Sequence, residues 1–113
     1  MSSSKNKPNS NSVHLKVSGD MSGERVLALE KEFETLIAGL SMGTNVVLDL
    51  RTVTHIDSRG ISLCVGMYKK CAKRNANFSI NAGSESLRIL TQIKLDKIIR
   101  IQVLPDDNNQ TDS

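Results

Sequence analysis

The pattern of apolar and polar positions divides the chain into segments that alternate between strand and helix periodicity. Residues 13–17 place an apolar side chain at every second position, which predicts a half-buried strand that ends at the polar residues 18–20. Residues 24–40 carry apolar side chains at helical spacing, and residues 46–50 form a nearly continuous apolar run, typical of a strand buried on both faces. The helical stripe consists of Val26, Leu29, Phe33, Leu36, Ile37 and Leu40.

The second half of the chain continues this alternation. Residues 51–56 are predicted to form a loop, and a helix is expected over about 58–74. Ser84 is a suitable N-cap for a third helix. The remaining predicted elements are a strand over 77–81, a helix over 85–93 and a strand over 98–103. The side chains expected to be buried are Ile61, Cys64, Val65, Tyr68, Cys71 and Ala72 in the second helix, Phe78 and Ile80 in the strand, and Leu87, Leu90 and Ile93 in the third helix.

The resulting order is β-α-β-α-β-α-β, which predicts a layered α/β domain with a mainly parallel sheet and helices packed against it. The length of 113 residues suits one such domain. We expect the folded unit to span residues 13–104. The segments 1–12 and 105–113 are polar, and we expect them to be disordered tails.

The amino-acid composition limits which kinds of partner the protein is expected to bind. Aromatic residues make up 3% of the chain, so the core must be aliphatic and a base-stacking platform for nucleic acid is not expected. The net charge of +3 does not by itself indicate a nucleic-acid partner. Four basic residues cluster at the end of the second helix: Lys69, Lys70, Lys73 and Arg74. We interpret this cluster as a solvated helix end, with a phosphate-binding patch as the alternative.

The two cysteines, Cys64 and Cys71, are expected to be buried, reduced thiols. On a helix they lie about 10 Å apart, too far for a disulfide. No histidine lies close enough in the sequence to complete a zinc site, and we expect neither a metal nor a cofactor. The amino-terminal segment lacks the apolar stretch of a secretory signal, and no apolar run is long enough to span a membrane. We therefore expect a cytoplasmic protein without a membrane partner.

The most informative segment is Asp57-Ser58-Arg59-Gly60, which opens a helix shortly after a buried strand. The carboxyl ends of parallel strands and the following helix N-termini often carry function, and free amide groups there favour negative charge. A phosphate on Ser58 would fit such a position. The simpler interpretation is that Asp57 or Ser58 only caps the helix.

An enzymatic interpretation of the same serine is weak. A nucleophile elbow requires Gly-x-Ser-x-Gly, and Ile56 stands where the first glycine is needed. His14 and His55 are the candidate bases. Neither a P-loop nor a dinucleotide-binding glycine pattern is present in the sequence. We expect a protein that is not an enzyme and has no catalytic residues.

The run from Val46 to Ile80 resembles the core of STAS domains, in particular the bacterial anti-sigma factor antagonists. These share a strand of the type [VI]-[VI]-L-[DN]-L and a later hydrophobic residue followed by D-S-x-G-[LI]. The matching residues are Val47, Leu48, Asp49 and Leu50, and then Ile56, Asp57, Ser58, Gly60 and Ile61. Residues 15–20 and 86–99 resemble the first strand and turn and the third helix and last strand of the family. The resemblance covers about 13–103 and implies a single STAS domain, with a mixed, mostly parallel sheet of four to five strands.

The resemblance also implies a partner switch. An unphosphorylated antagonist binds an anti-sigma factor that is a serine kinase of the histidine-kinase-like ATPase fold, which releases the sigma factor for transcription. The kinase phosphorylates the serine matching Ser58, the complex dissociates, and a metal-dependent serine phosphatase resets the protein. The alternatives are a STAS switch that controls secretion or another signalling system, and a STAS domain that binds a small ligand.

The predicted partner surface surrounds Ser58 and includes the turn after the first strand. Ser22 stands where many antagonists carry an acidic residue, and Arg59 where a small residue is common. The residues predicted to bind the partner are Asp20, Ser22, Thr54, His55, Asp57, Arg59, Gly60 and Ser62.

Overall fold

The computed structural model describes residues 11–104, which form four strands, three α-helices and one short 3-10 helix. The strands lie in the order β2-β3-β4-β5, and every neighbouring pair is parallel. The elements are β2 (Ser12–Met21), α1 (Gly23–Ala38), β3 (Asn45–Ile56), α2 (Ser58–Lys73), β4 (Asn77–Ala82), α3 (Ser84–Gln92), η2 (Leu95–Lys97) and β5 (Arg100–Val103). The predicted alternation and fold class are confirmed, although no antiparallel strand occurs within 11–104. Most of the two predicted tails lies outside the described residues.

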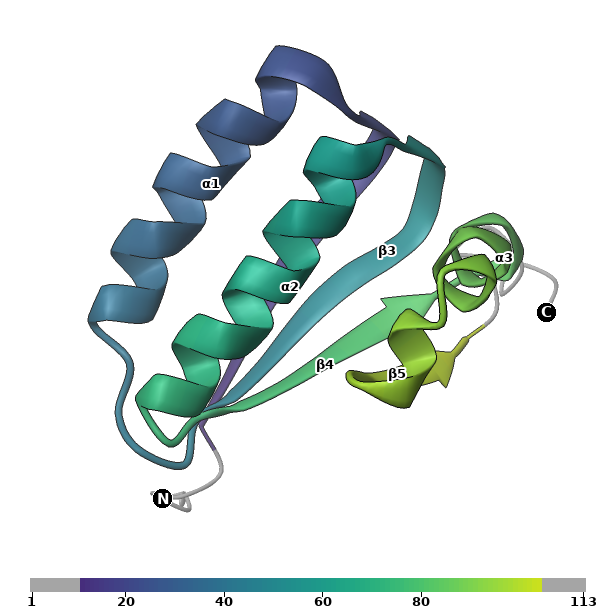
Figure 1. The fold of residues 1–113 in the computed structure, drawn as a ribbon. Coiled ribbons are helices and arrows are strands. Elements are labelled where there is room, and N and C mark those ends of the chain that lie inside the picture. Colours follow the sequence, from purple (N-terminus) through teal and green to yellow (C-terminus); the bar gives the residue numbers. More distant parts are fainter. Residues whose placement is uncertain (1–10, 105–113) are drawn as a thin grey trace, which may run out of the picture.

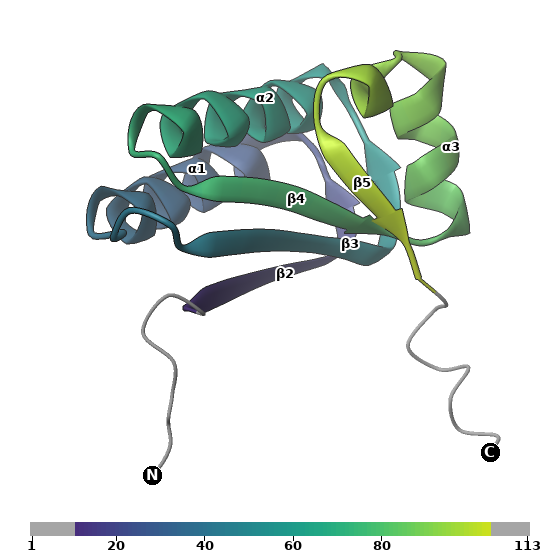
Figure 2. The same ribbon diagram turned by 90° about the horizontal axis from the view of Figure 1, so that it is seen from below.

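The helices gather on one side of the sheet. α1 and α2 run side by side across one face, as Figures 1 and 2 show. α3 packs beside the bent second half of β3. This is the arrangement that right-handed crossovers produce when each strand is added on the same side of the one before it. As a result, the first turns of α1 and α2 lie at the same end of the sheet.

The predicted loop over 51–56 is wrong, because β3 continues to Ile56. The predicted end of the first strand at residues 18–20 is also wrong, since β2 extends to Met21. The two extensions pair with each other, and the register shifts twice so that β3 gains an extra residue each time. Such bulges bend a strand, and Figure 1 shows β3 curving at this end.

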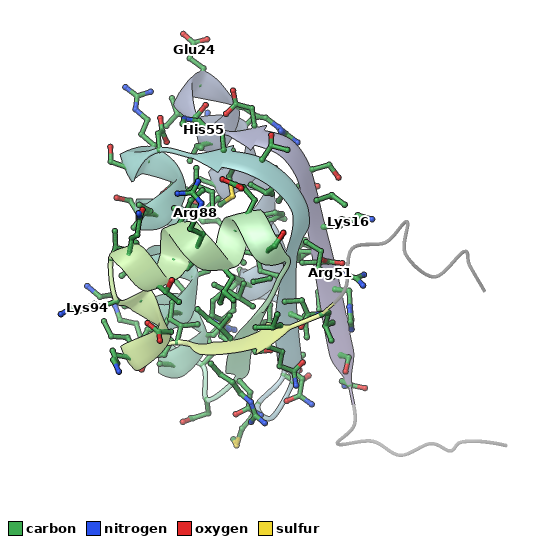
Figure 3. The ribbon with its side chains drawn as sticks, turned by 90° about the vertical axis from the view of Figure 1, so that its right-hand side faces the viewer. Lys16, Glu24, Arg51, His55, Arg88 and Lys94 are labelled. Carbon is green, nitrogen blue, oxygen red and sulfur yellow. The ribbon has the colours of Figure 1, made fainter. Side chains whose placement is uncertain are left out.

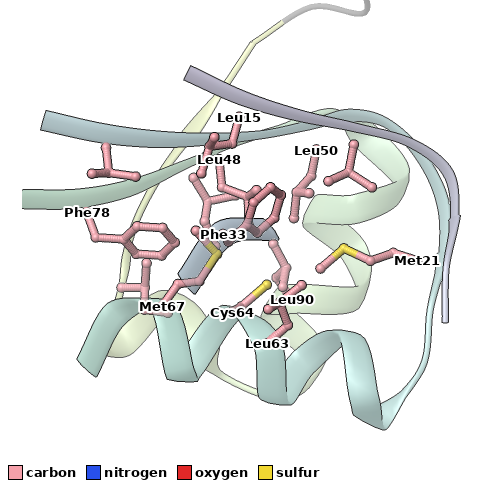
Figure 4. Close-up of a cluster of buried hydrophobic side chains, with 14 of the residues drawn as sticks. Leu15, Met21, Phe33, Leu48, Leu50, Leu63, Cys64, Met67, Phe78 and Leu90 are labelled. Atoms are coloured by element: carbon pink, nitrogen blue, oxygen red, sulfur yellow. The ribbon is translucent and has the colours of Figure 1, made fainter. Parts of the chain in front are cut away.

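The core is mainly aliphatic, as predicted, includes Phe33 and Phe78, and lies between the sheet and the helices (Figure 4). Leu63 and Met67 of α2 are buried, whereas the sequence pattern placed Val65, Tyr68 and Ala72 on the inner face. Val65 and Tyr68 are half-buried, and Ala72 is exposed. The buried stripe of α2 is therefore rotated from the prediction, because α1 covers the flank on which Leu63 and Met67 lie.

Smaller corrections concern the other helices. Leu36 and Ile93 were expected to be buried but are 43% exposed. Gly83, not Ser84, is the N-cap of α3, and its amide donates to the hydroxyl of Ser86 at 3.0 Å. The last strand begins at Arg100, because residues 95–97 form the 3-10 helix. Within residues 11–104, no helix has the length and apolar character that a membrane span requires.

Candidate functional site

The predicted site residues come together where β2 and β3 end and α2 begins. Asp20 and His55 are register partners near the ends of their strands. His55 lies at the same end of the molecule as Glu24 of α1, well away from Lys94 (Figure 3). The exposed predicted residues are Asp20, Thr54, His55, Ser58, Arg59 and Ser62, while Ser22 and Asp57 are half-buried. The site is therefore contiguous in the structure, although its residues come from two strands and a helix.

Asp57 is the N-cap of α2 and also binds the first residue of α1. The amide of Gly60 donates to Asp57 Oδ1 at 3.0 Å, and the amide of Gly23 donates to Asp57 Oδ2 at 3.1 Å. The Gly60 bond first, and then the Gly23 bond, lower the pKa of the Asp57 carboxyl, with a smaller contribution from Arg59. One carboxylate thus joins the starts of two helices.

Gly60 is buried, and the structure gives it a packing role. A Cβ atom at this position would lie 2.5 Å from the carbonyl oxygen of Met21 and 2.8 Å from Cγ2 of Ile56. Only a residue without a side chain allows α2 to start this close to the ends of both strands. The glycine therefore fixes where Ser58 is presented.

Ser58 is the first residue of α2 and is exposed. Within residues 11–104, its hydroxyl makes no hydrogen bond, because Asp57 supplies the cap. The simpler interpretation, that Asp57 or Ser58 caps the helix, is confirmed for Asp57 and wrong for Ser58. The hydroxyl is available at a helix N-terminus, where the backbone dipole favours added negative charge.

The turn between β2 and α1 contributes two residues that the sequence did not single out. Gly23 has a positive φ of 61°, which turns its amide toward Asp57. The guanidinium of Arg25 donates to the carbonyl oxygens of Ser18 and Asp20 at 2.7 and 2.6 Å. The hydroxyl of Ser22 donates to Asp20 at 2.6 Å and does not cap α1. The Ser-Gly-Glu-Arg run marks a helix start, but nothing in the sequence indicates these partners.

A groove of about 420 Å³ opens beside Ser58 between the first halves of α1 and α2. Its lining residues are Val26, Leu27 and Glu30 from α1, and Ser58, Arg59, Ser62 and Leu63 from α2. A larger hollow of about 710 Å³ lies at the opposite end of the sheet, near the starts of the strands. Function in parallel sheets gathers at the carboxyl ends of the strands, so the smaller groove is the more relevant one.

The two cysteines and the basic cluster lie outside this site. Cys64 and Cys71 are both buried and free, as predicted, and burial raises the pKa of the Cys64 thiol to about 12. No cluster of histidine, cysteine or acidic side chains suited to a metal ion occurs within residues 11–104. Lys70 of the basic cluster pairs with Glu34 at 2.6 Å.

The fold and the site together define a small parallel α/β domain that presents a serine at the start of its second helix. A family model described as "Mlab, STAS domain" matches residues 6–104. Because the match covers nearly the whole chain, the protein belongs to the STAS domain family.

Proposed function

We propose that the chain is an anti-sigma factor antagonist and that the phosphorylation state of Ser58 decides its partner. Unphosphorylated, it binds an anti-sigma factor that is a serine kinase of the histidine-kinase-like ATPase fold, and the sigma factor is released. Phosphorylation dissociates the complex, and a metal-dependent serine phosphatase restores the hydroxyl. The chain acts as ligand and substrate and not as an enzyme.

The observation that carries the proposal is the free, exposed hydroxyl of Ser58 beside a helix cap supplied by another residue. Its oxygen can form a bond to the γ-phosphorus of ATP as the bond to the bridging oxygen breaks and ADP leaves. The hydroxyl proton passes to a base of the kinase. Since the Ser58 side chain makes no hydrogen bond within residues 11–104, we expect the reaction to change the surface and leave the fold intact.

The charge of the product supports a role as a switch. A phosphate adds about −1.5 to −2 charges at neutral pH. That charge lies next to Asp57, whose carboxylate is stabilised by the two amide bonds. A surface that bound the neutral hydroxyl would then have to desolvate a strong anion, which opposes binding.

The test uses the purified chain with a purified candidate kinase, magnesium and ATP. Ser84 provides a matched control, because it is an exposed serine that opens α3 as Ser58 opens α2. We expect wild type and Ser84→Ala to take up phosphate and Ser58→Ala to take up none, as mapped by mass spectrometry. Calorimetry should show at least about tenfold weaker kinase binding after phosphorylation. Equal phosphate uptake by Ser58→Ala would contradict the proposal.

A pull-down with wild type and Ser58→Asp then identifies the output. Proteins captured by wild type and lost with the aspartate variant are the partners under control of the switch. Capture of a serine kinase that also binds a sigma factor supports the proposal. Capture of a secretion component in its place would assign the switch to another pathway.

A further inference from the structure

We propose that the groove between α1 and α2 binds an aliphatic side chain of the kinase that phosphorylates Ser58. On the kinase surface, a basic residue lies on one side of this side chain and an acidic residue on the other. This inference rests on the proposed function. It extends the predicted partner surface from the turn after β2 and the start of α2 to the first half of α1.

The apolar part of the groove is suited to an aliphatic group. Val26 and Leu63 form its floor and are only 4% and 6% exposed, whereas Leu27 stands at the rim with 51% of its surface exposed. A large apolar side chain this exposed beside a hollow is typical of a contact site. Burying Leu27 against another aliphatic group removes both surfaces from water, which favours binding.

The charged part of the groove limits what can occupy it. Glu30 of α1 and Arg59 of α2 line the groove from opposite helices, and within residues 11–104 neither has an ion-pair partner. Farther along the two helices, the ion pair between Lys70 and Glu34 spans the hollow that continues from the groove. A partner that places an aliphatic side chain between a basic residue facing Glu30 and an acidic residue facing Arg59 complements the apolar floor of the groove and both of its charges.

The same geometry explains why phosphorylation would release this partner. Ser58 and Arg59 both line the groove. A phosphate on Ser58 therefore stands at the edge of an apolar contact, where its desolvation opposes binding. Arg59 also becomes a counter-ion for the phosphate, which leaves the acidic residue of the kinase without its partner.

The experiment measures the affinity of the kinase that phosphorylates Ser58 for two pairs of matched variants. Leu27→Ala is compared with Leu36→Ala, since both leucines lie on α1, are 51% and 43% exposed, and only Leu27 lines the groove. Glu30→Lys is compared with Glu32→Lys, an exposed position on the same helix outside the groove. We expect Leu27→Ala and Glu30→Lys to bind at least about tenfold more weakly and the two control variants to bind as wild type.

Amide chemical-shift mapping of the wild-type chain with the same kinase adds a measurement that needs no variant. Shifts at Leu27 and Glu30 support the groove, and shifts confined to Thr54 and His55 overturn it. Equal affinities for Leu27→Ala and Leu36→Ala also overturn it, while the proposed function stands if Ser58→Ala still abolishes phosphorylation. If wild type neither binds nor is phosphorylated by any kinase of this class, both proposals fail.

Discussion

The carboxylate of Asp57 binds the amide of Gly23, which lies 34 residues earlier in the chain, at 3.1 Å. Its other oxygen binds the amide of Gly60 at the start of α2. The residue next to the candidate phosphorylation site thus ties together the turn after β2 and the helix that presents Ser58. The stability of this end of the domain should therefore depend on the charge of one side chain.

Asp57→Asn should lower the melting temperature at neutral pH by a few degrees, because the amide oxygen is a weaker acceptor for the same amide groups. The pKa of Asp57 is lowered in the folded state, so its stabilising effect is present above the unfolded pKa of about 4 and is lost as pH falls through the folded pKa. The difference between wild type and variant should therefore shrink below about pH 4. Asp96→Asn, at an exposed aspartate of η2, serves as the control. A difference that is constant with pH would count against the carboxylate's role.

Gly60→Ala should destabilise the domain by about 1–3 kcal/mol, the usual cost of overpacking a close contact. The added Cβ would meet the backbone oxygen of Met21, which cannot move without distorting β2. Gly66→Ala, six residues later in the same helix, has nothing within 4 Å of its Cβ and should stabilise by about 0.5–1 kcal/mol. Urea denaturation of both variants measures the contrast. Similar effects at the two positions would contradict the packing role of Gly60.

Ser58→Asp should weaken kinase binding without unfolding the domain. A negative charge at a helix N-terminus stabilises by about 0.3–1 kcal/mol, so the melting temperature should stay constant or rise slightly. Ser84→Asp adds the same charge to the start of α3 and should leave kinase affinity unchanged. Because Asp carries less charge than phosphate, we expect a smaller loss of affinity than phosphoserine gives. An unfolded Ser58→Asp variant would show that the position is structural.

The two cysteines should be unreactive in the folded protein, and reducing agent should not change the melting temperature. Both are buried and free, and burial raises the pKa of Cys64 from 9.0 to about 12, which lowers its thiolate population by about a thousandfold at a given pH. Thiol titration with a chromogenic disulfide should detect both only after denaturation. Ser84→Cys, at an exposed position, should add one fast-reacting thiol. Rapid labelling of the native wild type would contradict this burial.

Much of the fold could be predicted from the sequence because local periodicity reports which side of an element faces the core. The apolar run of residues 46–50 identified an interior strand, and the spacing in α1 identified buried residues such as Phe33 and Ile37. The predictions were wrong where the conformation of a segment depends on the strand or helix that packs against it. The predicted loop over 51–56 lies in a strand because the end of β2 pairs with it: His55 lies opposite Asp20, and Thr54 is the extra residue of a bulge.

The sequence by itself determined the alternation of strands and helices, the aliphatic core and the position of Ser58 at a helix start, since these follow from side-chain periodicity and local capping chemistry. Only the tertiary structure decided that Asp57 also binds Gly23, that Gly60 lies against Met21, and that Leu27 shares a groove with Ser58. These relationships join residues that are far apart in the chain or on different helices. They depend on the bends in β3 and on the close packing of α1 against α2, which no local pattern encodes.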